Sequence, residues 1–279
     1  MIHKTTRQDV IPFHEICITR TASTVLSLLG VSAPAEMAPP IGQVLQAAGG
    51  RFSPLEGMPV CDRVFLYNPD AIAMWIYEKY ADYFAEMEKL TDIRLNMLSV
   101  VPPVTPVCFG SMYSGLQPAD HGILKYEKPV LKVTTLFDLL AKAGKKAAIV
   151  STEGDSISRI FLEREMDYFI YPHKETCNQK ALELIAGDKY DCIVLYNGDY
   201  DYHMHRHTPE GKRALRALRE NIDTFTKLHA AIRTHWNAHR TALAFAPDHG
   251  CHKAYAFLGA HGKNLPCDMN IPHFYSLLG

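Results

Sequence analysis

Aspartate and histidine residues gather in the last third of the chain at spacings that suit a metal site. Asp201 and His205 are four residues apart, so a turn or the start of a helix would direct both side chains the same way. Asp248 and His249 directly follow an apolar run and precede a glycine, and His261 comes shortly after them. Carboxylates and imidazoles are typical ligands of Zn²⁺, and of Mn²⁺ or Fe²⁺ where oxygen ligands predominate. The pattern therefore predicts a metal centre.

The histidine-rich segment 201–207 has a second interpretation when it is taken alone. A solvated loop without a metal would explain it equally well, and only the motifs at 248–250 and 261–262 favour the metal site. His203 and His207 are expected to lie outside that site.

Thr105 is the hydroxyl residue with the most suitable position for nucleophilic attack. Pro106 follows it, and proline is favoured at the first position of a helix. Free N–H groups and the helix dipole at such a position attract a phosphoryl group. A threonine hydroxyl is a poor nucleophile at neutral pH, but metal coordination can lower its pKa. Without the metal motifs, Thr105 would be interpreted as an ordinary helix cap.

Short apolar segments alternate with helical patterns along most of the chain. This alternation predicts an α/β fold with a mainly parallel central sheet between helix layers. Parallel sheets place ligand sites at the carboxyl ends of their strands, which is where the residues discussed here are expected. The predicted strands are 63–67, 95–101, 147–151, 191–196 and 242–246, and the predicted helices are 21–29, 41–48, 71–90, 109–116, 135–143, 180–185 and 210–236.

Residues 104–123 resemble the nucleophile segment of the alkaline phosphatase superfamily, and especially of its nucleotide pyrophosphatase/phosphodiesterase-like branch. In that branch a threonine opens a helix that ends in Thr/Ser-Gly-Leu-x-Pro, and His-Gly-Ile follows; here the segment reads VTPVCFGSMYSGLQPADHGI. Residues 134–145 are similar to the next helix of the superfamily. The segments 201–205, 248–250 and 261–262 resemble its metal motifs. The matches span roughly residues 60–279 in the expected order.

The resemblance implies an alkaline-phosphatase-like fold and two divalent cations about 4 Å apart. Zn²⁺ is the expected metal, with Mn²⁺ as the alternative. Thr105 would attack phosphorus, and water would then cleave the covalent phosphothreonine. One cation would be held by Asp201, His205 and His261, and the other by Asp248, His249 and Thr105 together with an aspartate after the first strand.

The sequence departs from the superfamily at that last ligand. The superfamily usually has aspartate directly after the first strand, often followed by glycine, whereas here the aligned residue is Asn68 and Asp70 stands two residues further on. Three alternatives remain open. Asn68 could supply an uncharged carbonyl oxygen, a turn at Pro69 could bring Asp70 into the site, or Asp70 could only favour a helix dipole. In the last case the chain would be a catalytically impaired homologue that binds a metal or a ligand.

We therefore expect a metal-dependent hydrolase of phosphate esters, whether phosphodiesters, pyrophosphates or phosphomonoesters, with a small phosphorylated substrate. A phosphonate hydrolase that breaks a C–P bond would use the same ligands and is the enzymatic alternative. Strand and helix units fill the interval from Thr105 to Asp201, so we predict no cap domain. Residues 1–279 would form a single domain, with 1–60 as a lead-in and 61–279 as the catalytic core. Tyr126 and Lys128 lie either near the site or on an unrelated surface.

Composition restricts the remaining possibilities. The 279 residues carry a formal net charge of -1, so neither a nucleic-acid polymer nor an anionic membrane is an expected partner. No apolar run is long enough for a membrane span, and the N-terminus lacks the apolar segment of a secretory signal. The seven cysteines form no CxxC pair, which is typical of reduced thiols in a cytoplasmic protein. The sequence does not determine the oligomeric state.

Overall fold

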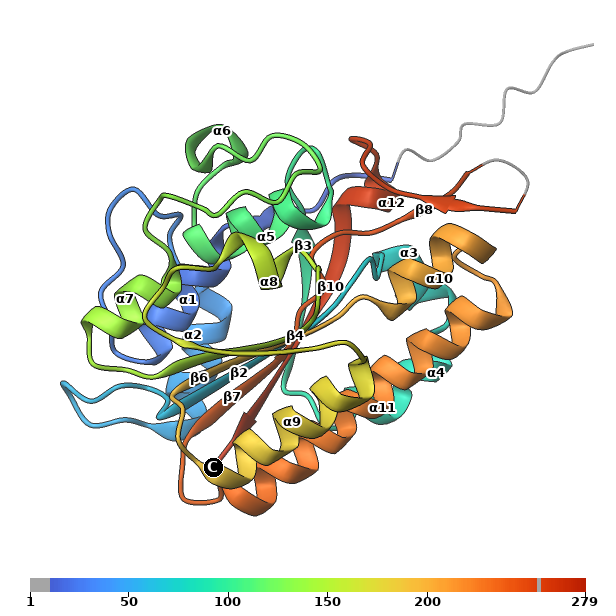
Figure 1. Ribbon diagram of the computed structural model, residues 1–279. Helices are drawn as coiled ribbons and strands as arrows, with labels where there is room; N and C mark the ends of the chain where they lie inside the picture. Colours follow the sequence, from blue (N-terminus) through green and yellow to red (C-terminus); the bar gives the residue numbers. More distant parts are fainter. Residues whose placement is uncertain (1–10, 255–256) are drawn as a thin grey trace, which may run out of the picture.

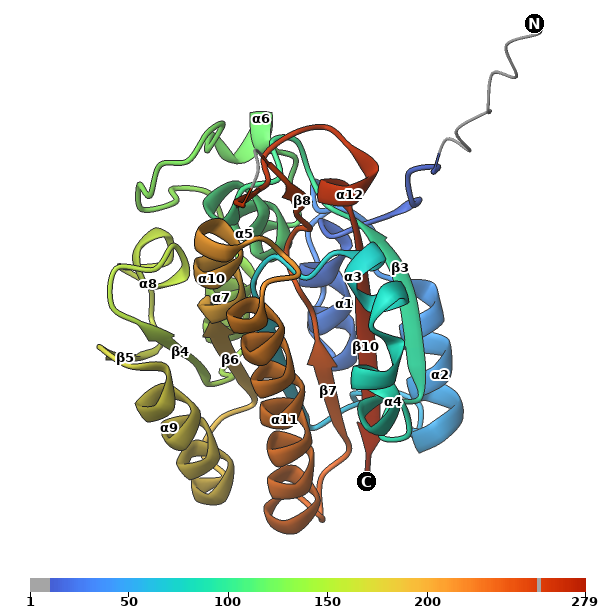
Figure 2. The ribbon, with the colours of Figure 1, turned by 90° about the vertical axis from the view of Figure 1, so that its right-hand side faces the viewer.

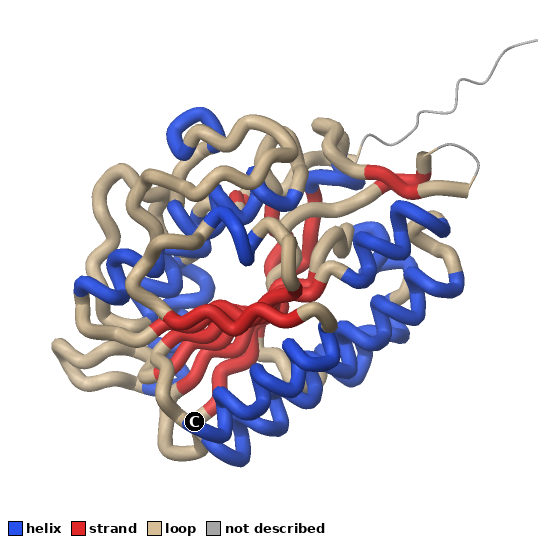
Figure 3. Tube along the Cα trace, viewed as in Figure 1, coloured by secondary structure: helices blue, strands red, loops and turns tan. Residues whose placement is uncertain are grey.

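An eight-stranded sheet lies between two layers of helices in the computed structural model, which describes residues 11–254 and 257–279 (Figures 1 and 3). The strand order is β1-β3-β10-β7-β2-β6-β4-β5, and all neighbouring strands are parallel except where β10 pairs with β3 and β7. The strands are β1 (Ile16–Cys17), β2 (Arg63–Pro69), β3 (Ile93–Leu98), β4 (Ala147–Thr152), β5 (Asp167–Tyr171), β6 (Cys192–Asn197), β7 (Thr241–Phe245) and β10 (Asn270–Leu278). The predicted α/β fold with a mainly parallel sheet is confirmed.

Both faces of the sheet are buried under helices. Successive side chains of a strand point to opposite faces, so each strand contributes to both hydrophobic cores. Along β2, Val64 and Leu66 join one hydrophobic core, whereas Phe65 and Tyr67 join the other. The first core is covered by α1 (Arg20–Leu28), α2 (Gly42–Phe52), α5 (Thr105–Ser114), α7 (Leu136–Lys142) and α8 (Ile157–Ile160). The second is covered by α3 (Met74–Lys79), α4 (Ala81–Glu88), α9 (Lys174–Gly187), α10 (Asp199–His207) and α11 (Lys212–His235).

Four short elements lie near the end of the sheet that carries the predicted site. They are α6 (Pro118–His121), β8 (His252–Lys253), β9 (Gly259–Ala260) and α12 (Pro266–Met269). Figure 2 shows α5, α10, β8 and α12 together at this end, above the strands. The lead-in segment contributes β1, α1 and α2 to the same sheet and helix layer.

Several element boundaries differ from the sequence-based expectations. The helix expected over 71–90 is two helices, because the backbone of Tyr80 leaves helical geometry (φ -115°, ψ 36°). The Tyr80 hydroxyl donates a hydrogen bond to Glu210. The helix expected over 109–116 begins at Thr105 and is closed by Gly115 in the left-handed region (φ 71°). Strands β1, β5 and β10 of the sheet were not expected. Pro272 and His273 interrupt the alternation of β10, but pairing with both β3 and β7 stabilises the strand.

Two further observations concern the expected cellular location. All seven cysteines are free thiols. Within the described part of the chain, none of the helices is long and apolar enough to cross a membrane. The cytoplasmic location stays a prediction.

The carboxyl ends of three neighbouring parallel strands meet at one edge of the sheet. Strand β2 pairs with β6 on one side and with β7 on the other. The chain leaves β2 into Asp70, leaves β6 into α10 with Asp201, and leaves β7 towards Asp248. Residues that are far apart in the sequence are thus brought together by strand pairing.

Candidate active site

Two clusters of possible metal ligands form at this edge of the sheet. The first contains Asp201, His205 and His261, and the second contains Asp70, Asp248 and His249. Within each cluster the ligand atoms all lie within 4.8 Å of one another. The clusters are adjacent, because the His249 and His261 rings stack with their centroids 4.0 Å apart.

Thr105 lies against the second cluster. Its Oγ1 is 3.3 Å from Asp70 Oδ2 and 3.3 Å from His249 Nε2, and the side chain is almost fully buried. Thr105 is the first residue of α5, with Pro106 next to it. The hydroxyl is therefore held at the positive end of the α5 dipole, which favours an anion.

Helix α5, which begins with Thr105, packs closely against α6, the next helix of the chain. A side-chain carbon at Gly110 would lie 2.8 Å from the His121 ring, so only glycine fits on this side of α5. His121 Nε2 lies 2.9 Å from Ser111 Oγ, which fixes α6 against α5. The His-Gly-Ile sequence after the helix thus has a packing role.

The three histidines of the clusters are oriented in the same way. Nδ1 of His205, His249 and His261 lies 3.1, 3.0 and 2.9 Å from the carbonyl oxygens of Gly259, Gly250 and Pro103, respectively. These contacts assign the Nδ1–H tautomer, because a carbonyl oxygen only accepts hydrogen bonds. Each Nε2 lone pair is consequently free and faces the carboxylates, which is the usual arrangement of a metal-binding imidazole.

The carboxylates carry oxygen atoms that have no hydrogen-bond donor. Among the described residues, Asp70 Oδ1, Asp201 Oδ1 and Asp248 Oδ2 are buried without a hydrogen-bond partner. Asp201 Oδ1 lies 3.3 Å from His205 Nε2 and 3.4 Å from His261 Nε2. At these distances the lone pair of each Nε2 faces a lone pair of the carboxylate oxygen, and the two repel each other. A cation bound between the atoms would attract both. The donor set therefore fits divalent cations with mixed nitrogen and oxygen ligands.

The pKa shifts of the aspartates and of His261 are consistent with metal binding. Burial, and then the charge of Asp201, raise the pKa of Asp70, and burial followed by the charge of Asp70 raises the pKa of Asp248 well above its ordinary value. Burial lowers the pKa of His261 to about 3, so its ring is neutral and can act as a ligand. For Asp201, burial opposes ionisation, but His205 and His261 outweigh it and lower the pKa. A bound cation would favour the ionised form of all these carboxyls.

Asp70 enters the site, whereas Asn68 does not. Asn68 still belongs to β2, where its Nδ2 donates to the Ala246 carbonyl at 2.7 Å and its Oδ1 accepts from the Tyr113 hydroxyl at 2.5 Å. Both ends of this amide are thus used within the core. Asp70 is the first residue after β2 and also accepts a hydrogen bond from the Tyr196 hydroxyl.

Ala71 explains how Asp70 takes this position. Its φ of 62° lies in the left-handed region, where glycine is the usual residue. Its N–H is directed at Asp248 Oδ1, 3.5 Å away. Asp70 followed by the left-handed Ala71 reproduces the Asp-Gly pattern of the superfamily. The pattern lies two residues after Asn68, the position where the superfamily usually has aspartate. The strain at Ala71, about 1 kcal/mol, is of the kind found at functional sites.

A third group with ligand-like spacing consists of His252, Cys267 and Asp268. Both oxygens of the buried Asp268 carboxylate are already satisfied, one by His252 Nδ1 at 2.7 Å and the other by the Lys263 N–H at 3.0 Å. The Asp268 carbonyl also accepts from the Gly250 N–H at 2.7 Å. Asp268 therefore connects the segment that carries His249 to the segment that carries His261, and it acts as a structural link between the two clusters.

A cleft of about 560 Å³ opens from the two clusters towards the solvent. Asp70, Thr105 and Asp201 line its inner part. Tyr126 and Lys128 also line the cleft, as do residues that the sequence did not single out: Thr152, Asp155, Lys174, Tyr196, Asp199, Tyr202 and Arg206. No spacing pattern could have identified these residues, because separate segments of the chain contribute them. His203 and His207, on the same helix as Asp201, stack on each other and belong to neither cluster.

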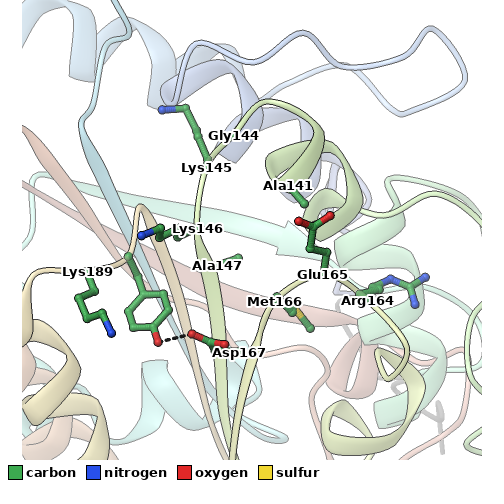
Figure 4. Close-up of a pocket in the computed structure, with 11 residues that line it drawn as sticks. Ala141, Gly144, Lys145, Lys146, Ala147, Arg164, Glu165, Met166, Asp167 and Lys189 are labelled. Atoms are coloured by element: carbon green, nitrogen blue, oxygen red, sulfur yellow. Dashed lines mark hydrogen bonds between the residues drawn. The ribbon is translucent and has the colours of Figure 1, made fainter.

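A second cavity, of about 550 Å³, lies away from the clusters (Figure 4). Lys145 and Lys146 precede β4 and Lys189 precedes β6, so this cavity is at the amino ends of the strands. Tyr190 and Asp167, which are joined by a hydrogen bond, both line it. None of the predicted site residues lines it, and it is not a candidate for the active site.

Comparisons with known proteins identify the family of this chain. The sequence profile described as type I phosphodiesterase/nucleotide pyrophosphatase matches residues 68–258. No curated protein matches the chain.

The fold is similar to that of human ectonucleotide pyrophosphatase/phosphodiesterase 5, with a TM-score of 0.55 and 15% sequence identity over 69% of this chain. A structure of the murine protein, an inactive variant in complex with AMP, gives the same values. The chain spans 58% of the length of each of these structures. Because the profile match covers more than half of the chain, the protein belongs to the type I phosphodiesterase/nucleotide pyrophosphatase family of the alkaline phosphatase superfamily.

Proposed function

We propose that the protein is a metal-dependent phosphoric ester hydrolase in which Thr105 attacks phosphorus beside two divalent cations. The observation that carries the proposal is the position of Thr105 Oγ1, 3.3 Å from both Asp70 and His249 at the start of a helix. The family assignment supports phosphodiester or pyrophosphate bonds as the bonds that are cleaved. The murine protein of similar fold is inactive when a threonine is replaced by alanine and is seen with AMP, which supports a small nucleotide as substrate.

We assign one cation to Asp201, His205 and His261 and the other to Asp70, Asp248 and His249. When bound, the cations would supply positive charge for the phosphoryl oxygens and lower the pKa of Thr105. The mixture of imidazole and carboxylate donors favours Zn²⁺ over Mg²⁺ or Ca²⁺, and Mn²⁺ is the alternative.

Asp70, Thr105 and the N-terminus of α5 have different roles in the reaction. Asp70 Oδ2 accepts the Thr105 hydrogen bond, so a lone pair of Oγ1 is directed away from the carboxylate and towards an incoming phosphorus. The N-terminus of α5 favours the phosphoryl group that Thr105 acquires when the bond to the leaving oxygen breaks. Water then cleaves the phosphothreonine and restores the hydroxyl.

Substrate preference and metal dependence test this function first. We expect bis-p-nitrophenyl phosphate to be hydrolysed faster than p-nitrophenyl phosphate, since the family acts on diesters. EDTA should abolish turnover, and added Zn²⁺ or Mn²⁺ should restore it. Cleavage of phosphonoacetate alone would favour the phosphonate hydrolase, and metal binding without any turnover would favour the non-catalytic homologue.

Replacement of Thr105 tests the nucleophile. Thr105→Ala should lower turnover by at least about a thousandfold, because it removes the Oγ1 that forms the covalent intermediate. Metal content, measured by elemental analysis, should stay unchanged, since the charged ligands remain. Thr105→Ser keeps the hydroxyl and should retain most of the activity. Normal turnover by Thr105→Ala would exclude this residue as the nucleophile.

Replacements of Asp70 and Asn68 identify the ligand at the end of β2. Asp70→Asn should lose metal because it removes a charged ligand. Asn68→Ala should keep the metal but unfold more easily, by about 1–3 kcal/mol, since it leaves the buried Tyr113 hydroxyl and Ala246 carbonyl without partners. Elemental analysis and thermal unfolding measure the two effects. The assignment would be reversed if folded Asn68→Ala lost metal while Asp70→Asn kept it.

Asp268 is expected to position both histidine-bearing segments without touching the substrate. Asp268→Asn removes one acceptor from the link between Lys263 and His252, and metal affinity should fall about 10- to 100-fold. Excess Zn²⁺ should restore turnover, which a general folding defect would not allow. The matched control is Asp92→Asn, which removes a carboxylate acceptor of the Leu277 N–H at the other end of β10. Unchanged metal affinity in Asp268→Asn, or an equal loss in the control, would contradict the role.

A further inference from the structure

The two carboxylate oxygens of Asp70 have different partners. Oδ2 accepts hydrogen bonds from two hydroxyl groups, those of Tyr196 and Thr105. Oδ1 has no hydrogen-bond donor among the described residues and lies 3.3 Å from His249 Nε2. A carboxylate oxygen has two lone-pair positions, so two donors fully occupy Oδ2. Oδ1 is the oxygen that remains for a cation.

Tyr196 reaches Asp70 from the core of the protein. It is the last residue but one of β6, where it pairs with Asn68 of β2. Its side chain is buried on the side of the sheet that α5 covers, and its ring packs edge-on against Phe109 of that helix, with the ring centres 5.5 Å apart. The packing of the ring therefore fixes the direction from which the hydroxyl approaches the carboxylate.

The backbone of Asp70 is attached to the same strand. The Asp70 N–H donates to the Asn197 carbonyl at 3.0 Å, so the pairing of β2 with β6 continues to the residue after β2. Asp70 is thus connected to β6 twice, once through its backbone and once through the Tyr196 hydroxyl. With the main chain held and one oxygen bound, the carboxylate has little freedom to rotate.

Gly198 leaves room for the Tyr196 hydroxyl. A side-chain carbon at Gly198 would lie 2.8 Å from the hydroxyl oxygen and 3.3 Å from two atoms of the ring. The φ of Gly198 is -92°, a negative value that other residues also adopt, so the backbone itself does not require glycine here. The requirement comes from the space that the tyrosine hydroxyl occupies.

We propose that Tyr196 is a positioning residue that makes Asp70 a one-oxygen ligand, because its hydroxyl holds Oδ2 and thereby presents Oδ1 to the cation of the second cluster. The inference rests on the proposed function, which assigns this cation to Asp70, Asp248 and His249. Tyr196 acts through Asp70 and is not itself a ligand. Outer groups that hold a metal-binding side chain typically contribute about 10- to 100-fold to metal affinity.

Tyr196→Phe tests this role, because it removes the hydroxyl and keeps the ring. Zn²⁺ binding to the metal-free protein is measured by competition with a chromophoric chelator. In an Asp201→Asn background the second cluster keeps its full set of ligands, and Tyr196→Phe should weaken its Zn²⁺ affinity about 10- to 100-fold. In an Asp70→Asn background only the first cluster is complete, and Tyr196→Phe should leave its affinity unchanged.

Bound Co²⁺ provides a spectroscopic readout of the same change. Without the hydroxyl, Oδ2 of Asp70 is free to become a second oxygen ligand, so the coordination of the cation should differ. The visible absorption spectrum of Co²⁺ in the Asp201→Asn protein should therefore change when Tyr196→Phe is added. An unchanged spectrum would contradict the one-oxygen ligand.

Tyr113→Phe is the matched control. Tyr113 also packs against Phe109, with the ring centres 6.0 Å apart, and its hydroxyl also donates to a buried side chain of β2, the Asn68 amide. Asn68 belongs to neither cluster. Tyr113→Phe therefore also removes a buried hydrogen bond, which thermal unfolding measures, but it should leave the Zn²⁺ affinity of both clusters unchanged.

Gly198→Ala disturbs the same contact without altering Tyr196. The added methyl group would displace the hydroxyl, so the second cluster should bind Zn²⁺ less tightly. In the Tyr196→Phe protein the hydroxyl is absent, and Gly198→Ala should have much less effect. An equal effect of Gly198→Ala in the two backgrounds would contradict a role through the hydroxyl.

The role of Tyr196 would be overturned if Tyr196→Phe left the affinity of the second cluster unchanged, or if it weakened both clusters equally. It would also be overturned if Tyr113→Phe had the same effect. Failure of the proposed function would appear differently, as absent turnover by the wild-type protein with both cations bound. Turnover together with a second cluster that is insensitive to Tyr196→Phe excludes the positioning role alone, and two bound cations without turnover exclude the hydrolase alone.

Discussion

The structure depends on three aspartates whose carboxyl groups are crowded into a largely buried space at the edge of the sheet. Asp70 and Asp248 are essentially inaccessible to solvent, and each of the three has an oxygen without a hydrogen-bond donor among the described residues. Burying a charge without a partner is among the most costly arrangements in a protein. The fold can keep these groups only if they are protonated or if a cation binds between them. Binding of a cation and stability of this edge of the sheet are therefore linked.

The neighbouring histidines restrict what kind of partner can satisfy the carboxylates. Because Nδ1 of each ring is bound to a backbone carbonyl, Nε2 cannot donate a hydrogen bond while the ring stays neutral. Protonation of the rings would offer an alternative, but burial strongly disfavours it for His261, whose pKa falls to about 3. Divalent cations satisfy both kinds of atom at once. The geometry therefore suits divalent cations as partners of both the carboxylates and the imidazoles.

The sequence predicted the parts of this arrangement that are local. Aspartate and histidine at 201 and 205 lie on one helix, Thr105 opens a helix because Pro106 follows it, and each predicted strand appears within a few residues. The strand β10 was missed because Pro272 and His273 interrupt its apolar pattern, and its place in the sheet comes from pairing with β3 and β7. The link through Asp268 was missed because no spacing pattern marks the contacts that its carboxylate makes with His252 and Lys263.

Asn68 shows how a fold can keep a negative charge in the site although asparagine stands where the superfamily usually has aspartate. Strand β2 extends one residue beyond Asn68, and the hydrogen bonds to Ala246 and Tyr113 fix the amide inside the core. An aspartate at this position would bury a charge next to a carbonyl oxygen, which repels it. With asparagine at 68, the negative charge moves to Asp70, and the left-handed Ala71 turns the chain so that this carboxylate meets Thr105 and His249. Under the proposed assignment of ligands, the number of anionic ligands therefore stays the same.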